Sequence, residues 1–351
     1  MTRPDQMTLL KSARLSVAPM MDWTDRHCRT FHRVLSDHAL LYTEMVTAPA
    51  LVRGGARHLL RFDPSEQPVA LQLGGSDPKE LAEAAAMGAD EGYAEINLNC
   101  GCPSDRVQSG SFGAVLMERP DIVAECCATM IDAQDVEVTV KCRIGVDYQD
   151  PAKVLPDFLA RVSAAGVGRF TIHARKAWLQ GLSPKENRDI PPLDYELVVQ
   201  MKEMFPHLHL SINGGVASLD EAEALLERGL DGVMVGRAAY HDPAAILSQA
   251  DQRIWAKRGP RPMDDVIEAM AGHIEAHLAG GGKLHQVTRH MLGLFSGQPG
   301  ARAWRRYLSE HAPKNGADAQ VLRDAYDLIK QAAETALNGE NKALEDISKD
   351  T

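Results

Sequence analysis

Residues 93–104 read Tyr-Ala-Glu-Ile-Asn-Leu-Asn-Cys-Gly-Cys-Pro-Ser. The apolar run from Tyr93 to Leu98 predicts a buried strand, and the Asn, Gly and Pro residues after it predict a tight loop. Pro103 fixes its own φ and so stiffens the backbone just after Cys102. A cysteine at the mouth of a loop after a strand is placed for chemistry. The alternative is that Cys102 is a small buried hydrophobic residue, as most free cysteines are.

Working outward, apolar runs of this kind alternate with helical patterns, which predicts βαβ units and a parallel sheet. The runs are nearly continuous in apolar residues, as in sheets that are covered on both faces. Eight of them in about 240 residues predict a (β/α)8 TIM barrel, at 15–20, 40–45, 68–73, 93–98, 136–142, 169–173, 208–213 and 232–236. A doubly wound sheet is the alternative, but the first βα turn, residues 19–22, lacks the glycine-rich dinucleotide fingerprint.

The chain has 351 residues, which is enough for a barrel of about 250 residues and a small second domain. Helical patterns without strands follow the barrel, at 264–278, 284–295, 301–308 and 319–337. We therefore expect a barrel domain at 1–245, an all-helical domain at 246–338 and a charged tail at 339–351 that frays.

Composition indicates a soluble globular protein, with 44% hydrophobic and 25% charged residues. No apolar run approaches the roughly 20 residues of a membrane span, and residues 1–10 lack the apolar core of a signal peptide. We expect a cytoplasmic protein. The six cysteines are scattered and do not form a disulfide framework. Cys100 and Cys102 have no second Cys/His pair at ligand spacing, so no metal is expected.

In a barrel, the C-terminal ends of the strands converge on the face that carries the active site. The polar residues at these ends are Met20–Asp22, Glu44, Gln72, Asn97–Cys102, Lys141, Arg143, His173 and Arg175. Lys141 ends an apolar strand, and since an unpaired buried charge is costly, we expect an anion or an electron-rich ring beside it. Asn213-Gly214-Gly215 and Gly236-Arg237 end the last two strands, where barrels often bind phosphate. These motifs predict a phosphorylated ligand.

The formal net charge is −10, so contact with a nucleic acid requires local positive charge. Residues 280–309 contain no Asp or Glu and hold Lys283, Arg289, Arg302, Arg305 and Arg306. The loop at 175–194 carries Lys176, Trp178, Lys185 and Arg188. Both segments favour contact with an RNA, through phosphates and through stacking of Trp178 on a base. The alternative for the basic helix is a solvated face.

The combination of motifs resembles the tRNA-dihydrouridine synthases, most closely their A subfamily, over residues 14–310. The motifs are Val17–Asp25, Gln72–Gly75, Glu95–Ser104, Lys141–Gly145, Thr171–Trp178, Leu182–Asn187, Asn213–Gly215, Gly236–Arg237 and Arg289–Phe295. The resemblance implies an FMN-containing TIM barrel followed by a helical domain that binds the D-loop and elbow of tRNA. It also implies reduction of the C5–C6 double bond of D-loop uridines, at 20 and 20a. NADPH reduces the flavin without a dinucleotide-binding domain, and we expect a monomer.

The same resemblance assigns roles to residues. Cys102 is the acid that protonates C5, and Cys100, which does not precede the proline, is the competitor. The flavin ring contacts are Pro19, Met20, Met21 and Gln72, with Lys141 and His173 near the flavin and the uracil. The phosphate contacts are Asn213, Gly214, Gly215, Gly236 and Arg237, and the tRNA contacts are Asn99, Lys185, Arg188, Arg302 and Arg305.

Two other functions are open. One is an FMN barrel that reduces a small molecule, which does not explain the basic helical segment. The other is a tRNA-binding factor that has lost catalysis, against which the presence of Cys102, Lys141 and His173 argues.

Overall fold

A computed structural model describes residues 5–104 and 112–349, with side-chain burial up to residue 338. Eight parallel strands close into a barrel in the order β1 to β8, which confirms the predicted (β/α)8 fold. They are β1 Leu15–Val17, β2 Leu40–Thr47, β3 Val69–Gly74, β4 Glu95–Cys100, β5 Glu137–Arg143, β6 Arg169–His173, β7 His209–Asn213 and β8 Gly232–Val235.

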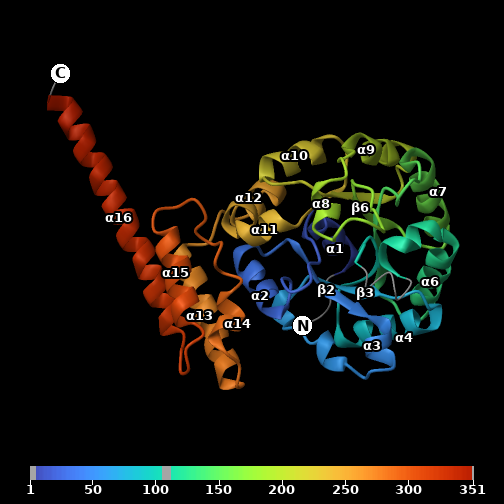
Figure 1. Cartoon of the computed structure of the whole chain (residues 1–351), viewed down its shortest axis with the longest axis horizontal. Helices are drawn as coiled ribbons and strands as arrows, with labels where there is room; N and C mark the ends of the chain where they lie inside the picture. The colour runs from blue at the N-terminus through green and yellow to red at the C-terminus, as the bar shows by residue number, and fades with distance from the viewer. Residues whose placement is uncertain (1–4, 105–111, 350–351) are drawn as a thin grey trace.

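Helices surround the barrel as a ring (Figure 1). Residues that favour helix N-termini precede several of these helices. Asp77 and Asp150 accept backbone hydrogen bonds at the N-termini of α4 and α7, and a proline follows each. The helices are α2 Arg26–Leu35, α3 Ala48–Val52, α4 Pro78–Glu91, α6 Pro120–Asp132, α7 Pro151–Ala164, α8 Glu186–Asp189, α9 Tyr195–Met204, α10 Leu219–Glu227 and α11 Arg237–His241. Short turns of other helix types lie at η1 Arg57–Leu60, η2 Pro64–Glu66, η3 Gly113–Glu118 and η4 Ala244–Ser248.

The barrel interior is closed at its N-terminal end by α1, Gln6–Ser12. Leu9 and Ala13 pack with Leu40, Ala70 and Ala94, which stand at or next to the starts of strands. Above them, a buried ion pair spans the barrel. Arg169 Nη2 lies 2.5 Å from Glu95 Oε2, and the other Glu95 oxygen accepts from the hydroxyls of Tyr42 and Thr139. The interior is therefore a packed core.

The strand register brings the expected site residues to one level. Asn99 pairs with Lys141 across β4 and β5, and Arg143 pairs with His173 across β5 and β6. His173 in turn pairs with Asn213 on β7. These side chains therefore stand at the C-terminal ends of neighbouring strands.

The remaining helices follow the barrel along the chain. They are α12 Ala250–Trp255, α13 Met263–Ala279, α14 Leu284–Thr288, α15 Ala301–His311 and α16 Gln320–Lys349. Helix α12 lies beside α10, whereas α13 to α16 lie to one side of the barrel, with α13 and α14 against α2 (Figure 1). A helix was expected over 284–295, but α14 ends at Thr288. The physical reason is that Gly293 packs on backbone. A Cβ there would lie 2.3 Å from the His241 carbonyl oxygen, so the chain turns after α14 to reach this contact.

Helix α16 continues through residues 339–349, where the sequence led us to expect a frayed tail. Residues 1–4 and 350–351, which the expected barrel domain and tail include, lie outside the described residues. The division of the chain at residue 245 stays a prediction.

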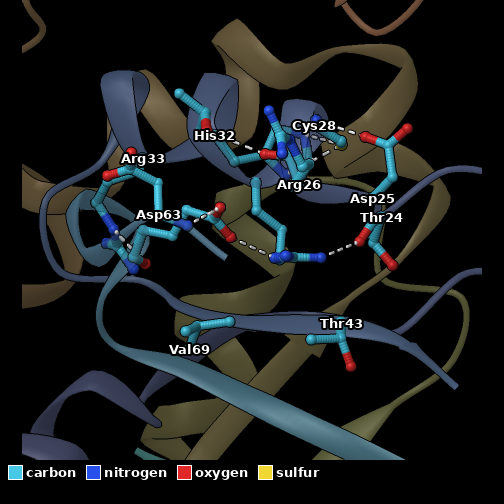
Figure 2. Close-up of polar contacts among 12 residues, drawn as sticks. Thr24, Asp25, Arg26, Cys28, His32, Arg33, Thr43, Asp63 and Val69 are labelled. Atoms are coloured by element: carbon cyan, nitrogen blue, oxygen red, sulfur yellow. Dashed lines mark hydrogen bonds and ion pairs between the residues drawn. The ribbon is translucent and has the colours of Figure 1, made fainter. Parts of the chain in front are cut away.

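Asp25 joins the barrel to the helical part. One carboxylate oxygen caps α2 by accepting from the amides of His27 and Cys28. The other accepts from Arg289 Nη2 at 2.6 Å and from His290 Nε2 at 3.1 Å. Burial opposes ionisation of Asp25, but the hydrogen bond and charge of His290, with the Cys28 amide and Arg289, hold its pKa well below the usual range. Figure 2 shows Asp25 at the start of α2, with Cys28 and His32 along that helix and Thr43 and Val69 on the strands beneath.

None of the helices in the described ranges has the length and apolarity that crossing a bilayer requires.

Candidate active site

Cys102 lies in the loop after β4, and Asn99 fixes the backbone of that loop. The Asn99 side-chain oxygen accepts hydrogen bonds from the amides of Gly101 at 2.9 Å and Cys102 at 3.0 Å. Cys102 is half-buried, with its Sγ 3.5 Å from the Ser104 hydroxyl. Cys100, in contrast, is fully buried, and this burial raises the pKa of its thiol well above the ordinary value. The partly accessible thiol is therefore that of Cys102.

Gln72 connects Asn99 to the barrel interior. Its Oε1 accepts from Asn99 Nδ2 at 2.9 Å, and its Nε2 donates to Asn97 Oδ1 at 2.9 Å. Asn97 then donates to Thr139 Oγ1 at 2.7 Å. Gln72 is only 1% exposed, so it supports the cysteine loop from below. The contact of Gln72 with a flavin ring stays a prediction.

Arg143 ties three loop segments together through their carbonyl oxygens. Its Nε donates to Gly101 at 2.9 Å, and its Nη1 donates to Lys176 and Asn187, each at 2.9 Å. The side chain is 2% exposed. Gly101 precedes Cys102, while Lys176 and Asn187 belong to the loop after β6. Arg143 thereby holds the cysteine loop and the β6 loop in one fixed arrangement.

Lys141 points toward β7. Its Nζ donates to Asn213 Oδ1 at 3.0 Å, and Asn213 Nδ2 donates to the Met234 carbonyl oxygen at 2.8 Å. Asn213 is therefore oriented by β8 and presents an oxygen to the lysine. Burial, then the charge of Arg143, lowers the pKa of Lys141 to about 8. The partner of Lys141 within the described chain is a neutral amide, and an anion beside it would stabilise the ammonium form.

His173 rests against a glycine at the end of β7. A Cβ at Gly214 would lie 2.5 Å from the imidazole ring, and Gly214 has a φ of +109°. Both the close contact and the backbone conformation therefore require glycine at this position. Burial, followed by the charges of Arg143 and Lys141, places the pKa of His173 well below its ordinary value. The imidazole is therefore neutral at pH 7 and has both a donor and an acceptor nitrogen.

Glycines follow the ends of β7 and β8 and pack closely against neighbouring side chains. Gly215 has a φ of +76°, and a Cβ there would collide with Leu193. Tyr195 donates its hydroxyl hydrogen to the Gly214 carbonyl oxygen at 2.5 Å. Arg237 begins α11, and its Nη2 forms a half-exposed ion pair with Asp189 at 2.7 Å. Binding of a phosphate at these strand ends stays a prediction.

Positive charge exceeds negative charge around His173. Arg175 also lowers the pKa of His173, after burial and the charges of Arg143 and Lys141. The Nε of Arg175 is buried and has no hydrogen-bond partner within the described part of the chain. Unpaired buried donors and repelling cations are both costly, so the site favours an anionic ligand.

The loop after β1 brings apolar side chains to the same face. The backbone N–H of Met20 donates to Thr24 Oγ1 at 2.9 Å, which shapes the loop. A Cβ at Gly236 would lie 3.8 Å from Met20 Sδ, so this loop lies next to the end of β8. Pro19 and Met20 are half-buried, and Met21 is 56% exposed. An exposed methionine here suits contact with a planar ring.

The four basic residues expected to contact tRNA fall into two places. Lys185 and Arg188 are exposed in the loop after β6, at the mouth of the barrel. Arg302 and Arg305 are exposed on α15, in the helical part beside the barrel (Figure 1). Asn99 is 8% exposed and is already bonded to the cysteine loop and to Gln72. The tRNA contacts of all five residues stay predictions.

Two features were not assigned from the sequence. Arg143 was recognised as a strand-end residue, but its bonds to three carbonyl groups depend on loop geometry that residue types do not reveal. Tyr148, 91% exposed in the loop after β5, was not singled out, although a lone aromatic in a polar turn is a visible signal. Within residues 5–104 and 112–349, no group of three or more His, Cys, Asp or Glu side chains is placed to hold a metal ion.

A closed parallel barrel whose strand ends carry a cysteine loop, a half-buried lysine and a buried histidine defines a (β/α)8-barrel enzyme. Among solved structures, a 2-naphthoyl-CoA reductase complex matches 70% of this chain and 50% of its own, with a TM-score of 0.52 and 11% identity. At that identity the likeness concerns the fold alone.

The family model described as dihydrouridine synthase matches residues 16–332, and the chain belongs to this family. A tRNA-dihydrouridine(20/20a) synthase from Shewanella oneidensis is 56% identical over 316 residues, which cover 90% of this chain and 93% of that protein. One from Escherichia coli strain K12 is 55% identical over 331 residues, covering 93% of this chain and 94% of that protein. The resemblance found in the sequence is confirmed.

Proposed function

We propose that this protein reduces uridines 20 and 20a of tRNA to 5,6-dihydrouridine. The observation that carries the proposal is identity of 54–56% to synthases of that name, over at least 90% of this chain. The site supports it, because a thiol, a half-buried lysine and a neutral imidazole stand at one face of a barrel, where the surrounding charge favours an anion.

The cofactor we propose is FMN, on which the dihydrouridine synthase family depends. The residues at the site fit it. The unpartnered Nε of Arg175 and the cations around His173 call for an anion, and Arg237, which begins α11 just after β8, could pair with its phosphate. Met20 and Met21 would lie against the ring, with Lys141 at its electron-rich edge. When bound and reduced, FMN supplies the hydride that adds to C6 of the uracil.

The protein's own residues supply the proton and the geometry. Cys102 donates the proton to C5, which completes the addition of hydrogen across the double bond, and solvent later returns a proton to the thiol. Asn99 holds the amide of Cys102, so the thiol stays aimed at one point. The neutral His173 donates a hydrogen bond to a uracil carbonyl oxygen. Lys141 stabilises negative charge that develops on the ring system beside it.

Four further parts of the proposal concern the reductant, the oligomeric state, the location in the cell and the binding of tRNA. NADPH is the reductant, and it acts without a dinucleotide-binding domain. The protein is a monomer, and it is cytoplasmic. The tRNA is held by the exposed basic residues of the β6 loop and of α15, because the chain as a whole carries a net charge of −10 and repels phosphate.

A single turnover tests the proposal. The flavin-loaded protein is reduced with NADPH without oxygen and mixed with tRNA that lacks dihydrouridine, and reoxidation and product are followed. We expect wild type to form dihydrouridine and Cys102→Ala to be about 10²- to 10⁴-fold slower. Cys100→Ala is the matched control, since the Cys100 thiol is buried, and it should keep most of the rate.

Other outcomes would redirect the assignment. Flavin that is reduced by NADPH but is not reoxidised by tRNA would point to a small-molecule reductase. A protein that binds tRNA and takes up no flavin would be a tRNA-binding factor. Equal rates for wild type and Cys102→Ala would leave the enzyme in place and remove Cys102 from its role.

A further inference from the structure

The turn after β5, residues 145–149, is fastened to the start of the β6 loop along its backbone. The amide of Ala177 donates to the Gly145 carbonyl oxygen at 3.0 Å, and the amide of Asp147 donates to the Ala177 carbonyl oxygen at 2.8 Å. Val146 and Ala177 form a parallel bridge between these bonds. The backbone of the turn is therefore paired with that of the β6 loop just beyond the end of the barrel strands.

Side chains fix the same turn further. Asp147 has a φ of +45°, a left-handed conformation that non-glycine residues rarely adopt, and its Oδ1 accepts from the Leu179 amide at 2.8 Å. Lys176 Nζ donates to the carbonyl oxygens of Asp147 at 2.8 Å and Gln149 at 3.3 Å. A strained turn with this many fastenings is held in one conformation by its surroundings.

What this turn displays is Tyr148, whose side chain is 91% exposed. The ring meets Trp178 edge-on, with centroids 5.2 Å apart and planes at 86°, and the Lys176 ammonium lies 5.5 Å from the centroid of the Trp178 ring. Single exposed apolar residues are ordinary. Here, however, the well-fastened backbone holds the Tyr148 ring exposed to solvent, beside Trp178 and the Lys176 ammonium.

Tyr148 also stands at the mouth of the barrel. Its loop follows β5, the strand that carries Lys141, and β5 lies between β4, which leads to Cys102, and β6, which leads to Trp178. The nearby carboxylate of Asp147 is bonded to the Leu179 amide, whereas Lys176 adds positive charge. A ring in such a setting suits a flat, uncharged group attached to phosphates, which is an unpaired nucleobase.

We propose that the Tyr148 ring, held edge-on against Trp178, is a stacking platform for an unpaired base of the tRNA, next to the uridine that enters the barrel. The proposal rests on the proposed function. Extruding a uridine costs stacking within the tRNA, and a base that stacks on Tyr148 offsets part of that loss. The platform thus contributes to the capture of the tRNA and to the choice of uridine.

The experiment compares Tyr148→Ala and Tyr148→Phe with wild type, by kcat/KM for unmodified tRNA and by flavin content. Stacking of a base on an aromatic ring corresponds to about 5- to 150-fold in affinity, so we expect Tyr148→Ala to lose about 10-fold in kcat/KM. Tyr148→Phe retains the ring and should stay within about twofold of wild type. Met204→Ala is the control, since Met204 is 58% exposed at the end of α9 that leads into β7, away from the mouth of the barrel.

A second readout identifies the base. The same kinetics are measured on tRNAs with one abasic D-loop nucleotide at a time. At the position that stacks on Tyr148, wild type and Tyr148→Ala should become equal. Equal kcat/KM of both proteins on intact tRNA would overturn the platform, and so would equal losses in Tyr148→Ala and Tyr148→Phe, because the hydroxyl would then be the relevant group. Wild type that does not act on tRNA at all would overturn the proposed function, and the platform with it.

Discussion

At the scale of single residues, Arg143 shows how one buried side chain positions another. It donates to the carbonyl oxygens of Gly101, Lys176 and Asn187, and Gly101 directly precedes Cys102. Arg143→Lys keeps the charge and cannot reach all three. We expect transfer from the reduced flavin to tRNA to slow about 10- to 100-fold, because small displacements of a reacting group cost that much. Rapid-mixing kinetics measures this step apart from flavin reduction by NADPH.

The comparison for Arg143→Lys is Arg161→Lys. Arg161 is a surface arginine that pairs with Asp121 and Asp157. Such exposed pairs contribute little, so this variant should behave as wild type in both half-reactions. If Arg143→Lys slowed flavin reduction and tRNA reduction equally, a general loss of structure would explain the result better than displacement of Cys102.

The pKa of Lys141 leads to a prediction on pH. Burial lowers this pKa from 10.5 to about 8 in the folded protein. Between these two values the unfolded chain binds more protons than the folded one, so the stability of the flavin-free protein should rise with pH there. Relative to Lys141→Met, wild type should gain about 1–2 kcal/mol from pH 8 to 10.5, a figure reduced because the side chain is half-buried. Denaturant unfolding at several pH values measures it, and a constant difference would contradict the lowered pKa.

Individual site residues were predictable where they stand at the end of an apolar run that predicts a strand. Lys141 and His173 end apolar runs, and Cys102 follows one, so their place at the barrel mouth followed from the alternation of strands and helices. The partners of these residues were not predictable. Lys141 was expected to need an anion or a ring, but in the structure it donates to the side-chain amide oxygen of Asn213. The two residues are 72 positions apart, so the sequence alone does not indicate this contact.

At the scale of elements, strands were more predictable than connections. All eight apolar runs are strands, because burial on both faces marks them strongly. Helix α2 has a weak apolar pattern, since its buried residues include Arg29, His32 and Arg33, which look polar in the sequence although Arg29 and Arg33 bond to buried partners. The end of α14 was missed, because the contact between Gly293 and His241 is visible only in three dimensions.

Helix α15 carries a prediction for tRNA binding. Trp304 and Leu308 are buried, while Arg302 and Arg305 are exposed. The double variant Arg302→Ala/Arg305→Ala should weaken tRNA binding about tenfold and lessen the slope of log affinity against log salt by about 1 to 2. Its flavin content should equal that of wild type. Titrations of tRNA at several salt concentrations give both quantities.

The matched variant for α15 is Arg323→Ala on α16. Arg323 is also in the helical part, but it lies 2.8 Å from Glu268 and is thereby neutralised. Its removal should leave the salt slope as it was. A loss of flavin in the α15 double variant, or an equal change of slope in both variants, would argue against α15 as a phosphate-binding helix.

At the scale of the whole molecule, the barrel and the helical part share one hydrophobic core. A continuous set of buried side chains runs from Phe31 on α2 to Ile274 on α13 and Trp304 on α15. Asp25 adds the ion pair to Arg289, and Trp23 stacks on Tyr240 at 4.5 Å near the same junction. The barrel carries the proposed chemistry and the helical part carries proposed tRNA contacts. Because the two parts share one core, we expect them to unfold together.

Two glycines test this unity. A Cβ at Gly293 would lie 2.3 Å from the His241 carbonyl oxygen, so Gly293→Ala should force the helical part away from α11 and destabilise the protein by about 1–3 kcal/mol. Gly272, inside α13, has open space around it, and Gly272→Ala should stabilise by about 0.5–1 kcal/mol. If the molecule is one cooperative unit, calorimetry and circular dichroism will show a single transition that moves down in the first variant and up in the second. Two transitions, of which the glycine variants move one, would mean that barrel and helical part fold separately, and the junction at Asp25 would then be a hinge between independent domains.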